Sequence, residues 1–397
     1  MNKKNLLFVI DSLEVAGAEK SLVSLLSLLN YSQYNVDLML FSHGGTFEKL
    51  LPKEVNVLKP LKYSTFAKLS IKRALLKSLE KGNFRMLISR INYSMEIKRK
   101  QYSNRGKARI FWEKVSNNIE NNPKTYDIAI SYAQGVPTFY VAEKVKAKKK
   151  LAWVNVSYRL TGKDKVFQKK YYDLYDRIVG VSESTKEIFL ETFPEYHNKM
   201  EVIYDINNPQ FISDMADIGD GYEDFFDGVR ILTIGRLARQ KGYDIALEAC
   251  KSLKEKGINF RWYVLGKGPL EEEIRQYVVT NDLTDHFILL GVKANPYPYI
   301  KKSDIYVQTS KFEGFGLAIA EARMLNVPVV TTNFDAVYNQ MVQNKNGFVV
   351  NMDSESVANG IINLINNHSL RNEITEYLKL EKKGNLEEIE KFYNLVV

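Results

Sequence analysis

The feature that most constrains the fold is a regular alternation of short apolar runs with amphipathic stretches, and it occurs twice along the chain. Such an alternation is typical of parallel sheets covered by helices. In the first half, the runs predict strands at Leu6–Ile10, Val36–Phe41, Ile128–Ser131, Leu151–Val154, Arg177–Val181 and Val202–Tyr204. Helices are predicted from Ala18 to Leu29 and from Glu183 to Phe193.

The same pattern restarts after residues 207–228, where an Asn-Asn-Pro turn and a dense acidic cluster predict an interdomain linker or a surface loop. Strands follow at Arg230–Ile234, Arg261–Leu265, Phe287–Leu290, Ile305–Gln308 and Val327–Thr331, with helices at Tyr243–Lys256, Leu270–Thr280 and Leu317–Leu325. A chain of 397 residues can bury two separate cores. The sequence therefore predicts an α/β fold with two Rossmann-like domains, 1–205 and 206–383, facing each other across a cleft.

The cysteine count and the lengths of the apolar runs indicate the compartment in which the protein is expected. The single cysteine, Cys250, excludes an internal disulfide framework and suits a reducing compartment, where it serves as a small core residue. The run Leu6–Ile10 is too short for the apolar region of a signal peptide. No stretch reaches the roughly 18 apolar residues that a membrane-spanning helix needs. We expect a cytoplasmic protein, either soluble or attached peripherally to the inner face of the cell membrane.

Charge is unevenly distributed. Residues 1–200 hold 35 lysines and arginines against 19 acidic residues, whereas residues 201–397 hold 21 against 28. The segment 59–114 alone carries 16 basic and three acidic residues, interleaved with apolar ones. This pattern indicates an anionic membrane surface as a partner, and a solvated lysine-rich helical face explains it equally well. Nucleic acid is not expected, because neither zinc-ligand spacing nor an RNA-reading aromatic motif accompanies the charge.

The most informative motif is the segment Ser310–Glu321. A predicted strand ends at Gln308, glycines keep the following turn open, and a helix begins just after Gly316. This arrangement presents backbone N–H groups and a helix dipole to an anion such as a phosphate. Two carboxylates there, Glu313 and Glu321, would repel a bare phosphate, so we expect them to bind the hexose and ribose hydroxyls of a nucleotide-sugar. Either glutamate alone would be better explained as part of a glycine turn on the surface.

Two further strand–glycine–helix units stand out. In Ile231–Gly242, Gly235 opens the turn, and Arg236 and Lys241 can neutralise a diphosphate, the role that a divalent metal has in other transferases. Arg239 is interpreted as surface charge. The chain has no Asp-x-Asp pair and only four histidines, none spaced as ligands, so we expect neither a metal nor another cofactor. The third unit surrounds Gly17 and is informative only through its place after the first strand.

The order of these motifs resembles that of the GT4 family of retaining glycosyltransferases, which have the GT-B fold. The motifs are Gly17-Ala-Glu19, Gly235-Arg236 with Lys241-Gly242, Gly266-Lys-Gly268-Pro, and Glu313 with Glu321. The resemblance covers nearly the whole chain and is most specific over 229–350. The segments 182–184 and 295–299 are similar to those of members that build bacterial surface polysaccharides. The resemblance also implies that the domain 1–205 is the acceptor side and that the domain 206–383 binds the nucleotide-sugar. A terminal helix, 384–397, is expected to pack back on the N-terminal domain.

The resemblance implies a role for each matching position. Catalytic roles fall to Glu313, Arg236 and Lys241. Donor-binding roles fall to Gly17, Gly235, Phe315, Gly316, Leu317, Glu321 and Val292, with Val292 against the nucleobase. Many relatives carry a histidine in a Trp-x-His segment beside the sugar, whereas this chain has Asn155 after Trp153. Asparagine can hydrogen-bond a sugar but cannot accept a proton near neutral pH, so the acceptor or the leaving phosphate takes it.

The expected function is retaining, metal-independent transfer of a hexose-type sugar from a nucleoside diphosphate sugar, UDP-linked, to a glycan acceptor. The resemblance implies a lipid-linked acceptor in bacterial surface polysaccharide synthesis. Two alternatives remain open at this point. One is a non-catalytic partner subunit that keeps the fold and binds glycan or protein, which the loss of the histidine favours. The other is a nucleotide-sugar epimerase, which would need acid–base groups that this histidine-poor sequence offers poorly.

Overall fold

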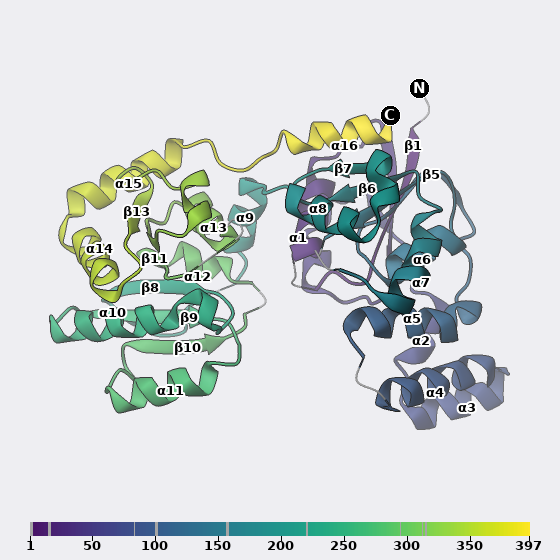
Figure 1. The fold of residues 1–397 in the computed structure, drawn as a ribbon, viewed down its shortest axis with the longest axis horizontal. Coiled ribbons are helices and arrows are strands. Elements are labelled where there is room, and N and C mark those ends of the chain that lie inside the picture. The colour runs from purple at the N-terminus through teal and green to yellow at the C-terminus, as the bar shows by residue number, and fades with distance from the viewer. Residues whose placement is uncertain are drawn as a thin grey trace. The chain divides into compact units, whose positions relative to one another are not determined.

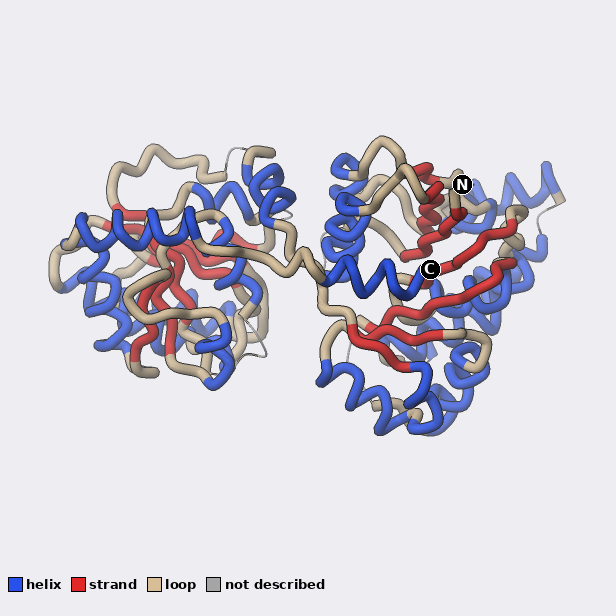
Figure 2. Tube along the Cα trace, turned by 90° about the horizontal axis from the view of Figure 1, so that it is seen from above, coloured by secondary structure: helices blue, strands red, loops and turns tan. Residues whose placement is uncertain are grey.

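The computed structural model describes residues 3–14, 17–82, 84–99, 102–155, 159–219, 221–293, 295–311, 313 and 316–397. The chain divides into two compact units. Unit 1 comprises residues 1–207 and 386–397, and unit 2 comprises residues 208–385. The division falls two residues after the predicted domain boundary. In each unit, helices surround a central sheet (Figure 2).

Unit 1 is built on a parallel sheet in which the described strands take the order β3-β2-β1-β4-β5-β6-β7. The strands are β1 Lys4–Ile10, β2 Tyr34–Leu40, β3 Val55–Val57, β4 Thr125–Ser131, β5 Lys146–Val154, β6 Arg177–Gly180 and β7 Met200–Val202. Strand order reverses between β1 and β4, so the loops that leave these two strands diverge to opposite sides. In open α/β sheets, ligands bind outside the carboxyl ends of the strands at such a switch point.

The helices of unit 1 are α1 Gly17–Leu28, α2 Lys62–Ala67, α3 Ile71–Lys81, α4 Phe84–Arg99, α5 Asn104–Val115, α6 Val136–Lys144, α7 Gly162–Tyr172, α8 Glu183–Thr192 and α16 Glu388–Val396. Side chains from both the sheet and these helices form one large apolar core, which includes Trp112, Phe139 and Tyr172. Four helices, α2 to α5, fill the long connection between β3 and β4 (Figure 1). This connection contains the basic segment 59–114.

Unit 2 repeats the plan with a parallel sheet in the order β10-β9-β8-β11-β12-β13. The strands are β8 Val229–Ile234, β9 Phe260–Leu265, β10 Phe287–Gly291, β11 Ile305–Gln308, β12 Val329–Thr332 and β13 Gly347–Val350. The helices are α9 Pro209–Ala216, α10 Tyr243–Glu255, α11 Glu271–Thr280, α12 Tyr297–Lys301, α13 Leu317–Met324, α14 Ser354–Asn366 and α15 His368–Leu380. The switch point lies between β8 and β11. Cys250 is buried in the core of this unit, as predicted.

The interpretation of residues 207–228 as a linker or surface loop is correct only in part: the unit boundary lies here, and residues 217–219 and 221–228 have neither helix nor strand, but residues 209–216 form a helix. The segment contains α9, and Asn208 caps this helix by accepting hydrogen bonds from the backbone of Gln210 and Phe211 at 3.0 and 3.4 Å. The acidic Asp224 forms ion pairs with Arg230 and Arg261 of unit 2. From Asn208 onward the segment therefore belongs to unit 2, where two of its acidic residues, Asp217 and Asp224, form ion pairs.

The terminal helix α16 belongs to unit 1, although the chain reaches it from unit 2. Phe392 is fully buried, with its ring centroid 6.0 Å from that of Phe8 and 6.2 Å from that of Trp153. The hydroxyl of Tyr393 donates to the carbonyl of Leu28 at 3.1 Å. The helix thus completes the core of the N-terminal unit, where the family resemblance placed it.

Candidate functional site

The candidate site of unit 2 lies at the carboxyl ends of β8 and β11, the two strands that flank the switch point. The loop after β8 contains Gly235 to Lys241, and the loop after β11 leads through Glu313 to α13. The backbone N–H of Lys311 donates to the carbonyl of Gln240 at 2.7 Å, so the two loops are directly joined. The topology therefore brings together two motifs that are 72 residues apart in the sequence.

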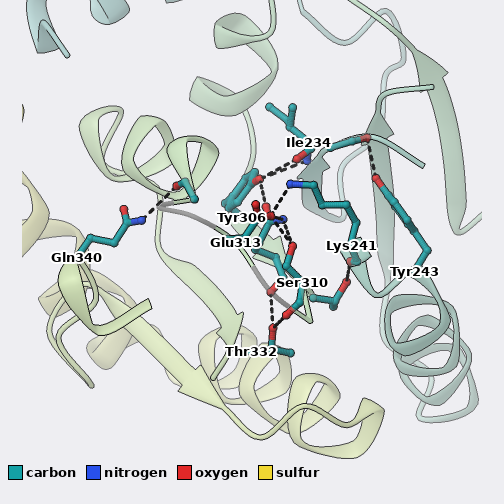
Figure 3. A network of polar contacts seen from close by, with 12 residues as sticks. Ile234, Lys241, Tyr243, Tyr306, Ser310, Glu313, Thr332 and Gln340 are labelled. Carbon is teal, nitrogen blue, oxygen red and sulfur yellow. Dashed lines mark hydrogen bonds and ion pairs between the residues drawn. The ribbon is translucent and has the colours of Figure 1, made fainter. Parts of the chain in front are cut away.

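An ion pair between Lys241 and Glu313 lies at the centre of this site (Figure 3). Both side chains are largely buried, with 18% and 11% of their surface exposed. Ser310 Oγ donates to the same Glu313 oxygen at 2.7 Å, and Gln308 Nε2 approaches it at 3.2 Å. Three donors thus converge on Oε1 of one carboxylate, which fixes its orientation and leaves Oε2 for another partner.

A second layer of buried groups holds these donors in place. Tyr306 donates to Gln308 Oε1 at 2.6 Å, which turns the Gln308 amide nitrogen toward the Glu313 carboxylate. Burial raises the pKa of Tyr306 well above its usual value, so its hydroxyl keeps the proton that it donates. Thr332 Oγ1 donates to the carbonyl of Ser310 at 2.6 Å and ties the loop to β12. The carboxylate is therefore preorganised by protein contacts.

Two glycines allow the Lys241 side chain to lie where it does. A Cβ on Gly235 would approach Cδ and Cε of Lys241 to 3.4 Å, so the lysine stem packs across this glycine. Gly242 has φ +64°, and a Cβ there would lie 1.9 Å from the carbonyl oxygen of Thr309. Any side chain at position 242 would thus separate the two loops.

The other residues predicted for the donor site in unit 2 differ in how they are placed. Glu321 is half-buried on α13, within 3.2 Å of the Tyr297 hydroxyl. Gly316 precedes α13 in the left-handed conformation, and its carbonyl accepts a hydrogen bond from Gln340 at 3.2 Å. Leu317, the first residue of α13, is 47% exposed. Phe315 lies outside the described residues.

Arg236 and Val292 are exposed. Among the described residues, the Arg236 guanidinium has no ion-pair partner, in contrast to Lys241. Val292 follows β10 and is 65% exposed. The structure therefore leaves a cation and an apolar side chain accessible at the carboxyl ends of β8 and β10.

In unit 1, the predicted residues lie at the corresponding end of the sheet. Gly17 is the first residue of α1, and a Cβ added there would meet nothing within 4 Å. The fold of the described residues thus does not itself require glycine at this position. Asn155 follows β5, and its Nδ2 donates to the carbonyl of Tyr132 at 2.6 Å. Among the described residues, its buried Oδ1 has no hydrogen-bond partner.

No role was assigned from the sequence to the residues that organise Glu313, namely Tyr306, Gln308, Ser310 and Thr332. A signal was present, because Gln308-Thr309-Ser310 is a polar run at the end of a predicted buried strand, and all three residues are buried. Polar side chains that leave a buried strand at a switch point need partners inside the protein. Metal independence is not decided by the fold and stays a prediction.

Comparison with known proteins supports the motif-based resemblance. Residues 226–381 match the family model described as "Glycosyl transferases group 1". An uncharacterized glycosyltransferase of Methanocaldococcus jannaschii is 30% identical over 169 residues, which is 42% of this chain and 41% of that protein. The capsular polysaccharide biosynthesis glycosyltransferase CapM of Staphylococcus aureus is 28% identical over 232 residues, 55% of this chain and 61% of that protein. The matches thus span about two fifths to three fifths of these relatives.

A solved structure shows the same architecture over both units. A variant of TarM from Staphylococcus aureus, in complex with fondaparinux, α-GlcNAc-glycerol and UDP, has a TM-score of 0.60 at 14% sequence identity. The likeness covers 99% of each chain. This likeness confirms the predicted GT-B fold class. The family model and the sequence relatives confirm the resemblance to glycosyltransferases that the motifs indicated.

Proposed function

The chain has the GT-B fold, and its residues 226–381 belong to the group 1 glycosyl transferases. We propose that it transfers a hexose-type sugar from a nucleoside diphosphate sugar to a glycan acceptor. The observation that carries this proposal is the Lys241–Glu313 pair at the switch point of unit 2. It joins a cation suited to phosphate with a carboxylate suited to hydroxyl groups in one preorganised site. CapM and the UDP-bound TarM variant favour a UDP-linked donor and a bacterial surface glycan as the product.

The site would bind the donor through complementary charge. Arg236, which is exposed, and Lys241 would contact the diphosphate, while the free oxygen of Glu313 would accept hydrogen bonds from sugar hydroxyls. Glu321 would receive the ribose hydroxyls, and the N-terminus of α13 would add a positive helix dipole. As the bond between the anomeric carbon and the diphosphate oxygen breaks, its electron pair passes to the diphosphate. Arg236 and Lys241 would stabilise that charge.

The acceptor hydroxyl forms the new bond to the anomeric carbon and loses its proton. Asn155 cannot take this proton near neutral pH. Same-face attack with retention of configuration fits a site in which the leaving diphosphate is the strongest available base near the sugar. Retention is part of the proposal. It is tested by comparing the anomeric configuration of the product with that of the donor.

The direct test is a screen of nucleoside diphosphate sugars with bacterial membranes as the source of acceptor, with the product identified by mass. The proposal predicts one labelled glycan product, which Glu313→Gln and Lys241→Met each reduce at least about 100-fold. Arg239→Ala, an exposed cation of the same loop, serves as the control and should keep turnover. Wild-type turnover in both site variants, or no product with any donor, would contradict the proposal. Full turnover in EDTA would agree with metal independence.

We also propose that helices α3 and α4 attach the protein to an anionic membrane surface. The two helices pack side by side (Figure 1), with Ala74 and Leu87 in a small shared core. Their outer faces expose eight large apolar side chains, each at least 44% exposed: Ile71, Leu75, Leu76, Leu79, Phe84, Ile88, Ile91 and Met95. On α4 these residues recur every three or four positions, so they line one face. No helix among the described residues is long and apolar enough to cross a bilayer.

Charge complementarity selects the membrane as the occupant of this face. The sequence of the two helices contains eight basic residues (Lys72, Arg73, Lys77, Lys81, Arg85, Arg90, Lys98 and Arg99), against only Glu80 and Glu96. Basic flanks around an apolar stripe favour the interface of anionic lipids. A second copy of the same chain would bring two positive faces together, which disfavours self-association.

Vesicle sedimentation tests this attachment. Binding to phosphatidylglycerol-containing vesicles, weakened by salt and absent with pure phosphatidylcholine, is expected for the wild type. Leu76→Glu with Ile88→Glu should abolish binding, whereas Leu380→Glu, at an 87% exposed position of α15, should not. Equal binding of both variants would show that the membrane contacts another surface, and concentration-dependent dimerisation instead would identify a protein partner.

A further inference from the structure

Helix α13 carries Glu321 of the proposed donor site, and its C-terminal end is held by the segment that follows α15. Arg323, in the last turn of α13, forms an ion pair with Glu381, the residue that ends α15, with Nη2 and Oε1 2.6 Å apart. Only 12% and 10% of the two side chains are exposed. Lys383 donates to the side-chain oxygen of Asn326, two residues after α13. All of these residues belong to unit 2.

The Arg323–Glu381 ion pair is only partly satisfied by the groups around it. Asn346, which is fully buried, donates from Nδ2 to Glu381 Oε1 at 3.0 Å. Within the described part of the chain, Arg323 Nε and Glu381 Oε2 are buried without a hydrogen-bond partner. A buried ion pair with unsatisfied atoms stabilises a fold no better than apolar side chains of similar size. The stability of the fold therefore gives little reason for a charge at position 323.

The guanidinium of Arg323 has a second contact, with the buried side chain of Gln340. Arg323 Nη1 donates to Gln340 Oε1 at 3.4 Å. On its other side, Gln340 Nε2 donates to the carbonyl of Gly316 at 3.2 Å (Figure 3). Because a guanidinium can only donate and a carbonyl can only accept, one orientation of the Gln340 amide satisfies both neighbours. Arg323 therefore fixes the direction in which Gln340 donates.

The carbonyl of Gly316 belongs to the peptide group that begins α13. The same planar peptide group carries the N–H of Leu317, which points in the opposite direction to the carbonyl. Gly316 has φ +84°, a conformation that glycine adopts and leaves without steric cost. The carbonyl accepts from the backbone N–H groups of Ile319 and Ala320 at 2.9 and 3.4 Å, and Gln340 adds a donor from outside the helix. These donors hold the peptide plane, and with it the direction of a first-turn N–H that has no acceptor within the helix.

We infer that Arg323 is a positioning residue of the donor site: through Gln340 it orients the first peptide group of α13 so that the Leu317 N–H donates to the donor diphosphate. The inference rests on the proposed function, which it extends to a residue without a role in the sequence motifs. The diphosphate is bound both before and during the transfer, so losing this contact should raise the KM for the donor more than it lowers kcat. The nucleoside part of the donor does not use this contact.

Calorimetric titration of the intact protein with UDP, and with uridine as a competitor, tests this role. Arg323→Lys keeps a cation for Glu381 but loses the planar fork that serves two neighbours at once. Gln340→Glu keeps an oxygen for Arg323 and places a second acceptor against the Gly316 carbonyl. Each variant should weaken UDP binding about fivefold or more and uridine binding no more than about twofold. In turnover, each should raise the KM for the donor about fivefold or more and change kcat less.

Gln343→Glu is the matched control, because it makes the same chemical change three residues further along the same loop. The side-chain oxygen of Gln343 accepts from the backbone N–H of Val349 at 2.7 Å, and a carboxylate can do the same. Gln343 is exposed and contacts β13 rather than α13. This variant should bind UDP like the wild type.

Since Arg323 acts through Gln340, the effects of the two substitutions on UDP affinity should not add, and the double variant should bind about as weakly as the weaker single variant. Undiminished UDP affinity in both single variants, equal losses for UDP and uridine, or strict additivity would overturn the inference. Circular dichroism checks the fold. If one variant unfolds, the other decides by the same criteria, and unfolding of both would show that Arg323 serves the fold itself.

The wild type is titrated first with UDP, ADP and GDP, and the nucleoside diphosphate that binds is then used together with its own nucleoside. Absence of binding to all three would contradict the proposed function. Binding to the wild type with undiminished affinity in the variants would overturn only this inference.

Discussion

At the scale of single residues, the Lys241–Glu313 ion pair affects both the stability of the fold and the proposed donor site. Its two charges are largely removed from water and are compensated chiefly by each other, with Ser310 and Gln308 as additional donors. A partly buried ion pair of this kind adds little stability compared with a pair of apolar residues in its place. Removing only one partner, however, leaves an uncompensated charge. A ligand diphosphate can compensate the charge of Lys241. Glu313 compensates it before the donor binds and so keeps both side chains in place.

This arrangement predicts strong coupling in a double-mutant cycle. Lys241→Met and Glu313→Gln should each lower the free energy of unfolding by about 2–4 kcal/mol, because each leaves its partner unpaired. The double variant should lose less than the sum of the two by at least about 1 kcal/mol. Urea unfolding monitored by circular dichroism measures all three values. Strict additivity would mean that the two side chains do not interact in the folded protein.

The raised pKa of Asp11, which follows β1, predicts that the stability of the folded protein depends on pH. Its pKa is raised from about 4 in an unfolded chain to about 7 in the folded protein, mainly by burial. Between these two pH values the folded state keeps a proton that the unfolded state releases, so stability falls as pH rises and then levels off above pH 7.

Asp11→Asn removes this titration. The variant should melt at the wild-type temperature near pH 4 and a few degrees above it at pH 8, since about 1 kcal/mol shifts the melting temperature of a domain this size by a few degrees. Thermal melts from pH 4 to pH 8 measure the difference, and Asp285→Asn, in an exposed turn, corrects for the change in net charge. A difference that does not depend on pH would show that Asp11 ionises normally.

At the scale of elements, α16 is the connection that closes unit 1 after the chain has passed through unit 2. Its inward residues Phe392 and Val396 are fully buried, and the Lys4 ammonium donates to the carbonyl of Val396 at 3.0 Å. Burial of apolar surface, rather than helix propensity, holds a nine-residue helix of this kind. The first and last segments of the chain are therefore interdependent.

Phe392→Ala should lower the free energy of unfolding by about 3–5 kcal/mol, because the removed ring leaves a cavity between Phe8 and Trp153. Asn394→Ala, on the exposed face of α16, should change it by no more than about 0.5 kcal/mol. Chemical unfolding followed by tryptophan fluorescence in a Trp262→Phe background reports on unit 1 through Trp112 and Trp153. Equal stability of both variants would mean that α16 is not docked in solution.

Sequence patterns located the elements best where a strand is apolar throughout. Strand β5 was predicted only from Leu151, but it begins at Lys146 and pairs along β4 through its lysines. Lys149 and Lys150 donate to the carbonyls of Leu395 and Ala142 at 2.6 and 2.7 Å, and Lys148 pairs with Asp127, so a charged run is compatible with a central strand. The last predicted strand of unit 1 was placed two residues too late. The short strands β3 and β13 were missed, because three or four residues give too little pattern to recognise.

The candidate site was predictable in its residues but not in its contacts. The sequence assigned separate tasks to Lys241 and Glu313, and the structure adds their ion pair, which depends on how β8 and β11 lie side by side. The sequence motifs assign no role to Asp11. In the structure, α2, α4 and α5 surround it with aromatic side chains from distant parts of the chain. Such convergence is a property of tertiary structure and leaves no local signal.

At the scale of the whole molecule, the two units share one architecture but present different chemical groups. Each unit has its own apolar core and its own switch point. The switch point of unit 2 presents cations, a fixed carboxylate and a helix N-terminus, which suit a nucleotide-sugar. The switch point of unit 1 presents an aromatic cavity that is also lined by Asp11, Lys68 and Lys107. The central claim is that unit 2 recognises the nucleoside diphosphate through Lys241.

Calorimetric titration of the intact protein with UDP tests that claim most directly, and ADP and GDP show whether the base matters. We predict saturable binding of UDP to the wild type, weakened at least about tenfold by Lys241→Ala because a charged contact to phosphate is lost. Arg239→Ala, an exposed cation two residues away, should leave the affinity unchanged. The absence of binding to every nucleoside diphosphate, or an undiminished affinity in Lys241→Ala, would contradict the account.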